Sequence, residues 1–375
     1  MAGHEVETVW RGRVVQAWLP DALRDRDLSL TERTARRTEQ AAAKARRGSD
    51  AMPQRWEALA RLLLRAEGVA SSFIEGVNAP LADVAAAELD PTAGETALWV
   101  VANLAAVRAA VAEARRGPLT TEALNRWHTT LMTGGSHLPA HLVGAPRDAQ
   151  GWIGGTSPLD AALVTPPPEH LGPLLDDLIT FANRTDIDPV TQAAVAHAQF
   201  EVVHPYADGN GRVGRVLVGW ILTRRLALVT PPAASVRIAA DRGGYLSGLA
   251  LFRRGDVDPW VRWFADVIGA AGDATFLLVQ AVTDLEQRWA ERLVGVRADA
   301  SARRVIRLLP QHPVLAAPTV AGELGTSQRA ARSALQTLAQ HAVVAPFQPS
   351  GRGRGRPPRW WVATELVHLV NAWSR

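Results

Sequence analysis

The twelve residues HPYADGNGRVGR, positions 204–215, combine side chains that suit chemistry on a bound anion. Pro205 ends a helix and leaves the His204 imidazole in a loop, where it can act as a general base. Gly209 and Gly211 allow the backbone to turn with its N–H groups inward, at the point where a second helix begins. The segment therefore predicts an anion-binding loop beside a base.

Three charged residues complete this cluster. Arg212 and Arg215 are three residues apart on the second helix, so they share one face of its first turn. Positive side chains are unfavourable at a helix N-terminus, and two of them there indicate a negatively charged ligand. Asp208 is a candidate ligand for Mg²⁺, which takes one or two carboxylates together with phosphate oxygens. This pattern predicts transfer of a nucleotidyl group from a triphosphate to a hydroxyl, with release of pyrophosphate.

Each of these features alone has a simpler structural explanation. His-Pro commonly ends a helix, Gly-Asn-Gly commonly forms a turn, and an isolated histidine is more often structural than catalytic. Their coincidence within twelve residues is what favours chemistry.

The composition excludes several classes of site. The chain has 375 residues, which favours two or three domains, and no cysteine, which excludes disulfides and zinc–thiolate sites and fits a reducing cytoplasm. Lys44 is the only lysine and no GxxxxGK surrounds it, so a Walker-type phosphate loop is excluded. The first residues lack a signal-peptide pattern, and no run of about 18 apolar residues occurs. We therefore expect a cytoplasmic protein with no membrane partner.

Hydrophobic periodicity predicts a mainly α-helical fold. Two short strand-like runs, 151–154 and 163–165, lie around turn residues and predict a β-hairpin. A further short strand is expected within residues 8–20, before Pro20. The expected helices cover 29–67 with a break before a second helix near Pro53, then 56–75, 93–116, 119–133, 188–204, 212–228, 244–253 and 259–294.

The segment 204–215 resembles the signature of the Fic family, HxFx(D/E)GNGRxxR, with Tyr206 in place of the family's phenylalanine. The matching residues are His204, Asp208, Gly209, Asn210, Gly211, Arg212 and Arg215. The resemblance implies an AMP transferase that moves AMP from ATP to a hydroxyl side chain of an unidentified target protein. His204 is then the base, Asp208 holds Mg²⁺ or alternatively Mn²⁺, and the other motif residues bind the nucleotide.

The resemblance extends over roughly residues 10–300. SSFIEG resembles the family's inhibitory motif (S/T)xxxE(G/N), filled by Ser71, Glu75 and Gly76. The motif implies that Glu75 forms a bidentate pair with Arg215 and blocks the site of the γ-phosphate. The alternative is a solvated carboxylate at a helix end.

Two further segments resemble family features. GWIGG followed by VTPPP resembles the flap that clamps a target segment beside the active site. GGYLSGL resembles the region after the core, in which Tyr245 lies near the adenine.

The C-terminal residues 301–375 carry ten arginines against Glu323 and Glu365, a net +8, whereas the whole chain is +4 and residues 1–300 are therefore −4. A helix-turn-helix pattern runs through this region, with helices at 319–324 and 328–340 around Gly325, and two strands around an arginine-rich loop follow. It resembles a winged helix, a module often appended to Fic proteins. Candidate phosphate contacts of DNA are Arg329, Arg332, Arg352, Arg354 and Arg356. The alternatives are homodimer formation and docking of the target protein.

These observations predict four regions. They are an N-terminal region with the inhibitory helix (1–90), a Fic catalytic core (91–275), a linking helix (276–300) and a winged helix domain (301–375). The function they favour is an autoinhibited protein adenylyltransferase, with AMP removal as a variant of the same site. The alternative is a DNA-binding transcriptional regulator whose Fic core senses nucleotide.

Overall fold

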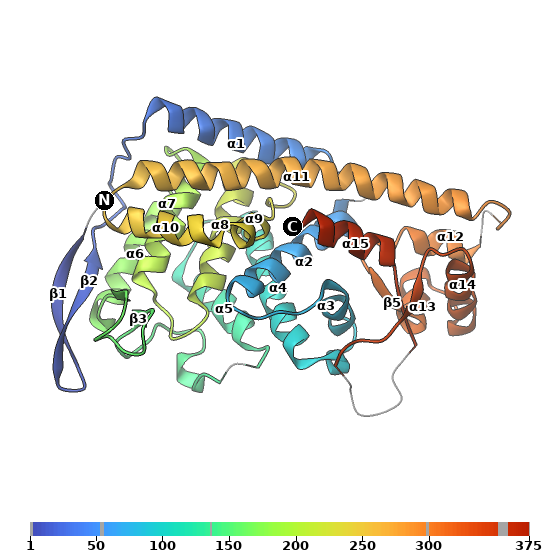
Figure 1. The fold of residues 1–375 in the computed structure, drawn as a ribbon, viewed down its shortest axis with the longest axis horizontal. Coiled ribbons are helices and arrows are strands. Elements are labelled where there is room, and N and C mark those ends of the chain that lie inside the picture. Colours follow the sequence, from blue (N-terminus) through green and yellow to red (C-terminus); the bar gives the residue numbers. More distant parts are fainter. Residues whose placement is uncertain (1–2, 53–55, 136, 298–299, 352–358, 375) are drawn as a thin grey trace.

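Figure 1 shows the computed structural model, which describes residues 3–52, 56–135, 137–297, 300–351 and 359–374. The protein is mainly helical, as the sequence predicts. Its longest helix, α11 (Val257–Arg292), runs beside α1 (Glu32–Asp50) along one edge of the molecule. The other helices of the body are α2 (Trp56–Ile74), α3 (Leu81–Ala87), α4 (Glu95–Ala114), α5 (Thr121–Met132), α6 (Leu171–Ala182), α7 (Pro189–Val203), α8 (Asn210–Leu226), α9 (Ala234–Ala240) and α10 (Arg242–Arg253).

Most helices of the body lie where the periodicity predicts them, but α3, α6 and α9 were not predicted. The reason is clearest for α6. It follows the run Pro166–Pro168, which suggested a stop, and it contains Pro173 within its first turn. Proline is tolerated there because the N–H groups of a first helical turn have no partner inside the helix.

The N-terminus forms a β-hairpin, in which the strand expected within residues 8–20 is the second strand and the first was not predicted. Strand β1 (Gly3–Trp10) pairs antiparallel with β2 (Arg13–Pro20), and Trp10 lies opposite Arg13. Arg11 and Gly12 both have positive φ, 47° and 77°, as a two-residue hairpin turn of the primed type requires. The hairpin extends from one end of the helical body (Figure 1).

The predicted flap hairpin is confirmed. Strands β3 (Trp152–Ile153) and β4 (Leu163–Val164) are antiparallel, and Trp152 lies opposite Val164. The loop between them is held by Asp160, whose carboxylate accepts hydrogen bonds from the backbone N–H groups of Thr156 and Ser157 at 2.9 and 2.8 Å.

The C-terminal region contains the two predicted helices on either side of Gly325, which has a φ of 60°. The helix α14 (Gln328–Gln340) has the expected bounds, and Arg329 and Arg332 are exposed on it. Strand β5 was not predicted, and the sheet has the antiparallel order β5-β7-β6. The other elements are α12 (Ser301–Ile306), β5 (Val314–Ala316), α13 (Ala317–Leu324), β6 (Ala345–Phe347), β7 (Trp360–Val362) and α15 (Thr364–Trp373). The candidates Arg352, Arg354 and Arg356 lie outside the described residues.

Two hydrophobic clusters hold the fold together. The first surrounds α7 and α8, the two helices that flank the HPYADGNGRVGR segment, and includes Trp127, Phe200, Trp220 and Trp260. The second joins α2, α3 and the end of α11 to the C-terminal elements through residues such as Trp289. The expected linking helix is therefore the last part of the continuous helix α11. Because α7 is buried on nearly all sides, its position is set by packing on several neighbours at once.

Two helices, α4 and α11, are long and apolar enough to cross a membrane by length and composition alone. In the most apolar stretch of these two helices, 56% and 61% of the residues are buried within the fold. Core helices of folded proteins can be equally long and apolar. The absence of a membrane partner stays a prediction.

Candidate active site

His204 lies between α7 and α8 in a strained backbone conformation. It caps α7 with φ 49° and ψ 58°, the left-handed region, because Pro205 disfavours helical geometry for the residue before it. The Nδ1 atom of His204 lies 3.3 Å from the carbonyl oxygen of Glu201. A carbonyl can only accept a hydrogen bond, so Nδ1 carries the proton and Nε2 is the basic nitrogen.

Burial, with a smaller contribution from Arg147, lowers the pKa of His204 to about 4, although the bond to the Glu201 carbonyl and the charges of Glu75 and Asp208 act in the opposite direction. The imidazole is therefore neutral at physiological pH. A neutral ring can accept a proton at once, which is the state a general base needs.

Asn210 and Tyr206 shape the loop that follows. The side chain of Asn210 accepts from the Tyr206 N–H at 2.8 Å and donates to the Tyr206 carbonyl at 2.7 Å. The Tyr206 ring is buried as expected, and its hydroxyl donates to Asn125 Oδ1 at 2.8 Å, which satisfies the polar atom that phenylalanine lacks. The side chain of Asn210 is thus directed at the loop backbone.

His128 supports the same loop from α5 and was missed by the sequence analysis. Its Nδ1 accepts from the Gly144 N–H at 2.9 Å, so Nε2 carries the proton and donates to the Asp208 carbonyl at 3.1 Å. The His128 ring stacks on Tyr206 with centroids 4.0 Å apart. Nothing in the local sequence around His128 indicates this role.

The loop requires glycine at two positions for different reasons. Gly209 has a φ of 78° and packs on α5, where a Cβ atom would overlap Met132. A Cβ atom on Gly211 would overlap the carboxylate of Glu75. The Glu75 carboxylate thus lies directly over the N-terminus of α8, where the first N–H groups have no partner within the helix. This is the place that the sequence analysis predicted for a bound anion.

Arg215 is buried and bound to Ser71 and Glu75, two of the three residues of the predicted inhibitory motif. Its Nη2 donates to Glu75 Oε1 at 2.7 Å and to the Ser71 carbonyl at 2.9 Å, and its Nε donates to Ser71 Oγ at 2.9 Å. The expectation of a bidentate pair is wrong, because only one oxygen of Glu75, which follows the end of α2, accepts from Arg215, and Ser71 of α2 accepts the other two bonds. Gly76 follows with a φ of 84° and ends the segment.

The charge on Glu75 is stabilised by its neighbours. Burial alone would raise its pKa, but Arg215, and to a smaller extent Arg212 and His204, lower it overall. The side chain is 37% exposed, whereas that of Arg215 is 3% exposed. The arginine is therefore fixed, and the carboxylate lies at the surface of the site, from which it can leave.

Asp208 and Arg212 lie at the open side of the loop. The Asp208 side chain is 58% exposed, with Oδ2 at 3.4 Å from Arg212 Nη2 and Oδ1 accepting from the Gly209 N–H at 2.6 Å. The Nε of Arg212 is buried and has no hydrogen-bond partner among the described residues. The unpaired Nε of Arg212 can donate to a phosphate oxygen, and the exposed carboxylate of Asp208 can bind a cation that also contacts the phosphate. The described residues contain no cluster of three or more metal-ligating side chains.

Arg147 ties the flap to the His204 loop, and the sequence analysis missed it. Its side chain donates to the carbonyls of His204 at 3.0 Å and Pro166 at 2.6 Å, and its backbone N–H donates to Pro205 at 2.8 Å. Further bonds reach Thr165 Oγ1 at 2.9 Å and the Ala149 carbonyl at 2.8 Å. Burial lowers the pKa of Arg147 to about 10, so it remains charged.

Behind Arg215 lies a buried group of titratable side chains. Tyr245 is buried, and its hydroxyl lies 2.9 Å from His197 Nε2. His197 Nδ1 lies 3.9 Å from Glu201 Oε1, and neither atom has a hydrogen-bond partner among the described residues. Burial raises the pKa of Glu201 to about 8, which Arg215 opposes and Glu75 reinforces. Glu201 is therefore mostly protonated at neutral pH while Glu75 is bound to Arg215.

Some of these residues line a cleft of about 500 Å³. His204, Glu75 and Gly211 form one side, and the flap contributes Ile153, Ala162 and Leu163. Tyr245 lines the cleft together with Leu246 and Leu249 of α10, so the predicted adenine neighbour does face the cleft. Its placement near an adenine stays a prediction.

A family model described as "Fic/DOC family" matches residues 118–222, which include α5, the flap, α7 and most of α8. The chain is 32% identical over 125 residues to protein adenylyltransferase fic-1 of Caenorhabditis elegans, covering 32% of this chain and 22% of the relative. It is 30% identical over 168 residues to protein adenylyltransferase Fic of Drosophila willistoni, covering 44% and 30%. The chain thus spans less than a third of the length of these curated relatives.

A solved structure of a Fic family protein from Desulfovibrio desulfuricans G20 has a similar fold over most of the chain. It covers 89% of this chain and 97% of the other, with a TM-score of 0.53 and 22% sequence identity. At that identity the likeness concerns the fold.

Proposed function

The chain is a Fic domain protein, and on this premise we propose that it transfers AMP from ATP to hydroxyl side chains of a target protein. The observation that carries the proposal is the arrangement around the N-terminus of α8. A neutral His204 and the anion position over Gly211 line one cleft, and the buried cation Arg215 is bound to the Glu75 carboxylate that occupies this position. The names of the adenylyltransferase relatives support the same activity.

In the proposed reaction, the target hydroxyl oxygen attacks the α-phosphorus of ATP. His204 Nε2 takes the hydroxyl proton, a new oxygen–phosphorus bond forms, and the bond to the bridging oxygen breaks with release of pyrophosphate. The N–H groups at the start of α8 bind phosphate oxygens, and Arg212 and Arg215 neutralise the charge of the departing pyrophosphate. His204 holds the position this requires because Pro205 and Arg147 fix its backbone.

Asp208 is the residue that would hold the metal ion. Its exposed carboxylate provides one oxygen, and Mg²⁺ in nucleotide sites usually binds one or two carboxylates together with phosphate oxygens and water. Mn²⁺ fits the same donors. The metal, when bound, neutralises phosphate charge.

We further propose that Glu75 inhibits the transfer. Its carboxylate binds Arg215 and covers the N-terminus of α8. The γ-phosphate of ATP needs both of these groups. ATP can then bind only with its phosphates displaced. The Glu75 carboxylate can dissociate from Arg215, because Glu75 is the exposed member of the pair and Arg215 is the buried one. Removal of AMP from modified proteins is a variant of the same site in which Glu75 helps to activate water.

The C-terminal elements are consistent with a winged helix that binds DNA, which is our second candidate function. The order α12, β5, α13, α14, β6, β7 includes a helix pair with Arg329 and Arg332 exposed on its second helix. Such a helix can approach phosphates of a duplex. Homodimer formation and target docking are the alternatives for this surface.

One experiment tests the main proposal. Wild type and Glu75→Gly are incubated with ATP labelled at the α-phosphate and with Mg²⁺, and protein-bound label is measured. We expect strong labelling of the Glu75→Gly protein or of an added lysate target, and weak labelling of wild type. If neither protein incorporates label while both bind ATP, the proposed activity is wrong.

A further inference from the structure

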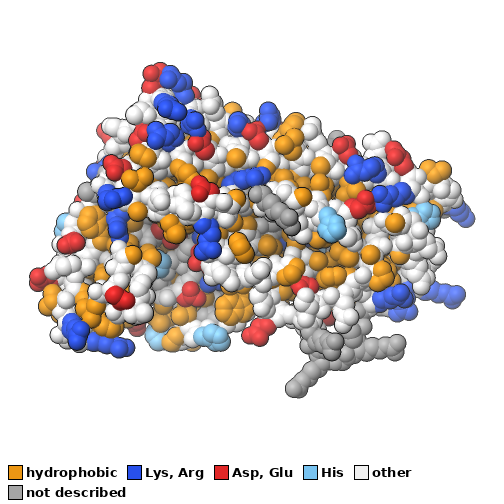
Figure 2. All heavy atoms as spheres, viewed as in Figure 1, with side chains coloured by type: hydrophobic (Ala, Val, Ile, Leu, Met, Phe, Trp, Pro, Cys, Tyr) orange, Lys and Arg blue, Asp and Glu red, His pale blue; other side chains and the backbone are white. Residues whose placement is uncertain are grey.

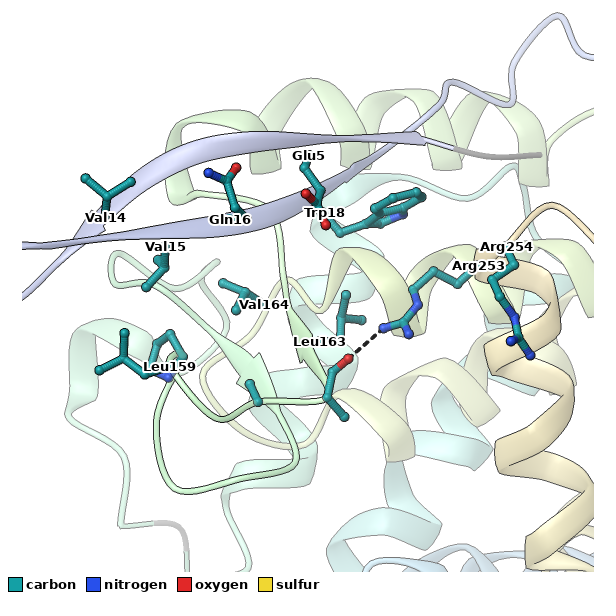
Figure 3. A pocket seen from close by; sticks show the side chains of 13 residues that line it. Glu5, Val14, Val15, Gln16, Trp18, Leu159, Leu163, Val164, Arg253 and Arg254 are labelled. Carbon is teal, nitrogen blue, oxygen red and sulfur yellow. Dashed lines mark hydrogen bonds between the residues drawn. The ribbon is translucent and has the colours of Figure 1, made fainter.

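The charged side chains of the protein lie in two different environments. Figure 2 shows basic and acidic side chains interspersed over the visible face, where water and salt screen their charges. The hollow between the N-terminal hairpin and the flap, of about 520 Å³, is of this kind, because Glu5 and Arg254, which line it, are exposed (Figure 3). The charged group behind Arg215 is withdrawn from water, so the charge of each member depends on its neighbours.

Glu201 of α7 packs against α8 directly before Arg215. A Cβ atom on Gly214 would lie 2.6 Å from Glu201 Oε1, so glycine at this position lets the carboxyl group reach the helix backbone. The Glu201 side chain is 12% exposed, and its Oε1 atom is buried with no hydrogen-bond partner among the described residues. An ionised carboxylate in such a place is costly unless a cation lies nearby, and its protonation therefore follows the charges around it.

The charged and titratable groups around Glu201 come from every element packed against it. Arg215 of α8 favours the ionised form of Glu201, and Glu75, which follows α2, opposes it. On α7 itself His197 Nδ1 lies 3.9 Å away, and burial lowers the pKa of His197 to about 3. Tyr245 of α10 is bonded to His197, and burial raises the pKa of Tyr245 well above its usual value. Within this group, Glu201 is thus the member that exchanges a proton near neutral pH.

The buried charge of Arg215 needs a counter-ion in each state of the site. In the inhibited state Glu75 provides it, and the Arg215 side chain is only 3% exposed. When Glu75 leaves, Arg215 loses this anion and Glu201 loses a repelling charge, and both changes favour an ionised Glu201. A γ-phosphate on Arg215 returns the negative charge and reverses both changes.

From this geometry we propose that Glu201 is a further positioning residue of the reaction and acts as the second counter-ion of Arg215. It gives up a proton to solvent when Glu75 leaves Arg215, and it takes up a proton when the γ-phosphate of ATP binds there. The proposal rests on the proposed function, because it concerns how the same site accepts ATP.

The coupling has a defined sign. With a carboxylate on Arg215 the pKa of Glu201 is about 8, and without an anion there it is lower. Between these two values the ATP complex holds a proton that the free protein lacks, so affinity for ATP falls as the pH rises. Rates at saturating ATP do not report this change, and their pH dependence remains that of His204.

The test measures protons taken up on binding. The ligand is the α,β-methylene analogue of ATP with Mg²⁺, which cannot release pyrophosphate, and it is titrated into the full chain in two buffers of different ionisation enthalpy. We expect the Glu75→Gly protein to take up about 0.5 proton per analogue at pH 7, and its affinity to fall about three- to tenfold between pH 7 and pH 9. Wild type, in which Glu75 remains on Arg215, should show neither effect.

Two substitutions in the Glu75→Gly background assign the proton. Glu201→Gln keeps the shape of the protonated group and should abolish both the uptake and the pH dependence. Glu67→Gln is the matched control, because Glu67 is a second buried acid whose carboxylate interacts with Arg215. Both of its oxygens accept from Ser235, one from the N–H at 2.8 Å and the other from the hydroxyl, so this substitution should leave both effects in place.

Equal proton uptake with and without Glu201→Gln would overturn the proposal, and so would uptake that Glu67→Gln abolishes. Equal uptake by wild type and the Glu75→Gly protein would also overturn it, and this comparison does not depend on the folding of the Glu201→Gln protein. Failure of the Glu75→Gly protein to bind the analogue would have the same consequence. Label transfer from ATP decides the proposed function separately, because the analogue is bound and not consumed.

Discussion

Two buried arginines lie beside the candidate active site, and they differ in what they bind. Arg147 joins the flap to the His204 loop, and its side chain donates only to uncharged oxygens, among them the carbonyls of His204 and Pro166. Arg215 joins α2 to α8 and binds the carboxylate of Glu75. Carbonyls of a folded backbone cannot leave, whereas a half-exposed carboxylate can. One arginine is therefore a fixed brace, and the other is a contact that a ligand can replace.

The largest effect on AMP transfer is expected from a substitution of His204. His204→Ala should lower AMP transfer at least 100-fold in the Glu75→Gly background, since general base catalysis contributes about 10²–10⁴-fold. ATP binding should persist, because the phosphates are bound by α8, Arg212 and Arg215. Label incorporation is compared with calorimetric ATP binding, and His141→Ala, an exposed histidine, is the control. Loss of both activities in a folded protein would make His204 a structural residue.

Removing the replaceable contact should activate the enzyme. Because Glu75 offers one hydrogen bond and is 37% exposed, the pair contributes about 1–2 kcal/mol after allowance for solvent screening. Glu75→Gln and Glu75→Gly should therefore raise AMP transfer roughly 5- to 30-fold. Glu57→Gln, at an exposed position on α2, the helix that ends just before Glu75, should have no effect.

The comparison of these two substitutions is informative in itself. Glutamine keeps the shape of the side chain and loses its charge, whereas glycine also loosens the end of α2. Activation by glycine alone would assign the block to the position of the helix and not to the ion pair. Equal rates for wild type and both variants would contradict the autoinhibition proposal.

Breaking the fixed brace should instead destabilise the site. Arg147→Ala leaves several buried oxygens without their donor, which costs about 2–4 kcal/mol in the free energy of unfolding. It should also lower AMP transfer, because the backbone of His204 loses its support. Denaturant unfolding and label incorporation are measured together.

Arg224→Ala is the matched control for the brace. Arg224 also donates to two backbone carbonyls, of Ala114 at 3.2 Å and Gly117 at 2.7 Å, away from the cleft. It should reduce stability without reducing the transfer rate of the folded protein. If both variants lose the same fraction of activity, Arg147 has no specific role in positioning His204.

Ser71 tests the hydroxyl that completes the replaceable contact. Ser71→Ala removes the acceptor of Arg215 Nε, and one such hydrogen bond contributes about 0.5–1.5 kcal/mol, so activity should rise roughly 2- to 10-fold. The adjacent Ser72 is buried to the same extent but accepts from Asn103 at 3.1 Å. Ser72→Ala should therefore lower stability and leave the transfer rate unchanged, and equal activation by both would point to general loosening of α2.

The smallest expected effect is that of acid on the rate. With a pKa of about 4, His204 is roughly 90% neutral at pH 5, whereas an ordinary imidazole of pKa about 6.5 would be about 3% neutral. The kcat/KM of Glu75→Gly should therefore change little between pH 5 and pH 7.5. A decline centred near pH 6.5 would show that the ring is not desolvated in the working enzyme.

The local structure of the motif was predictable because it depends on neighbouring residues. Pro205, Gly209 and Gly211 determine a helix end, a turn and a helix start within twelve residues, so His204 and Asp208 meet at one loop whatever surrounds it. The mainly helical fold was predictable for the same reason, since periodicity and turn residues act over short distances. The helix α6 was not predicted, because the prolines just before it and in its first turn resemble a signal that ends a helix.

The sequence by itself determined the residues of the loop, the spacing of Arg212 and Arg215, and the helix that ends just before Glu75. Only the tertiary structure decided that Glu75, 140 residues before Arg215, reaches it with one oxygen and shares it with Ser71. The hydrogen bonds of Arg147 to the His204 loop and the hollow between the N-terminal hairpin and the flap likewise depend on the tertiary structure. The physical reason is that spacing along a chain sets which side chains share a turn, whereas contacts between distant segments depend on how all the buried faces pack together.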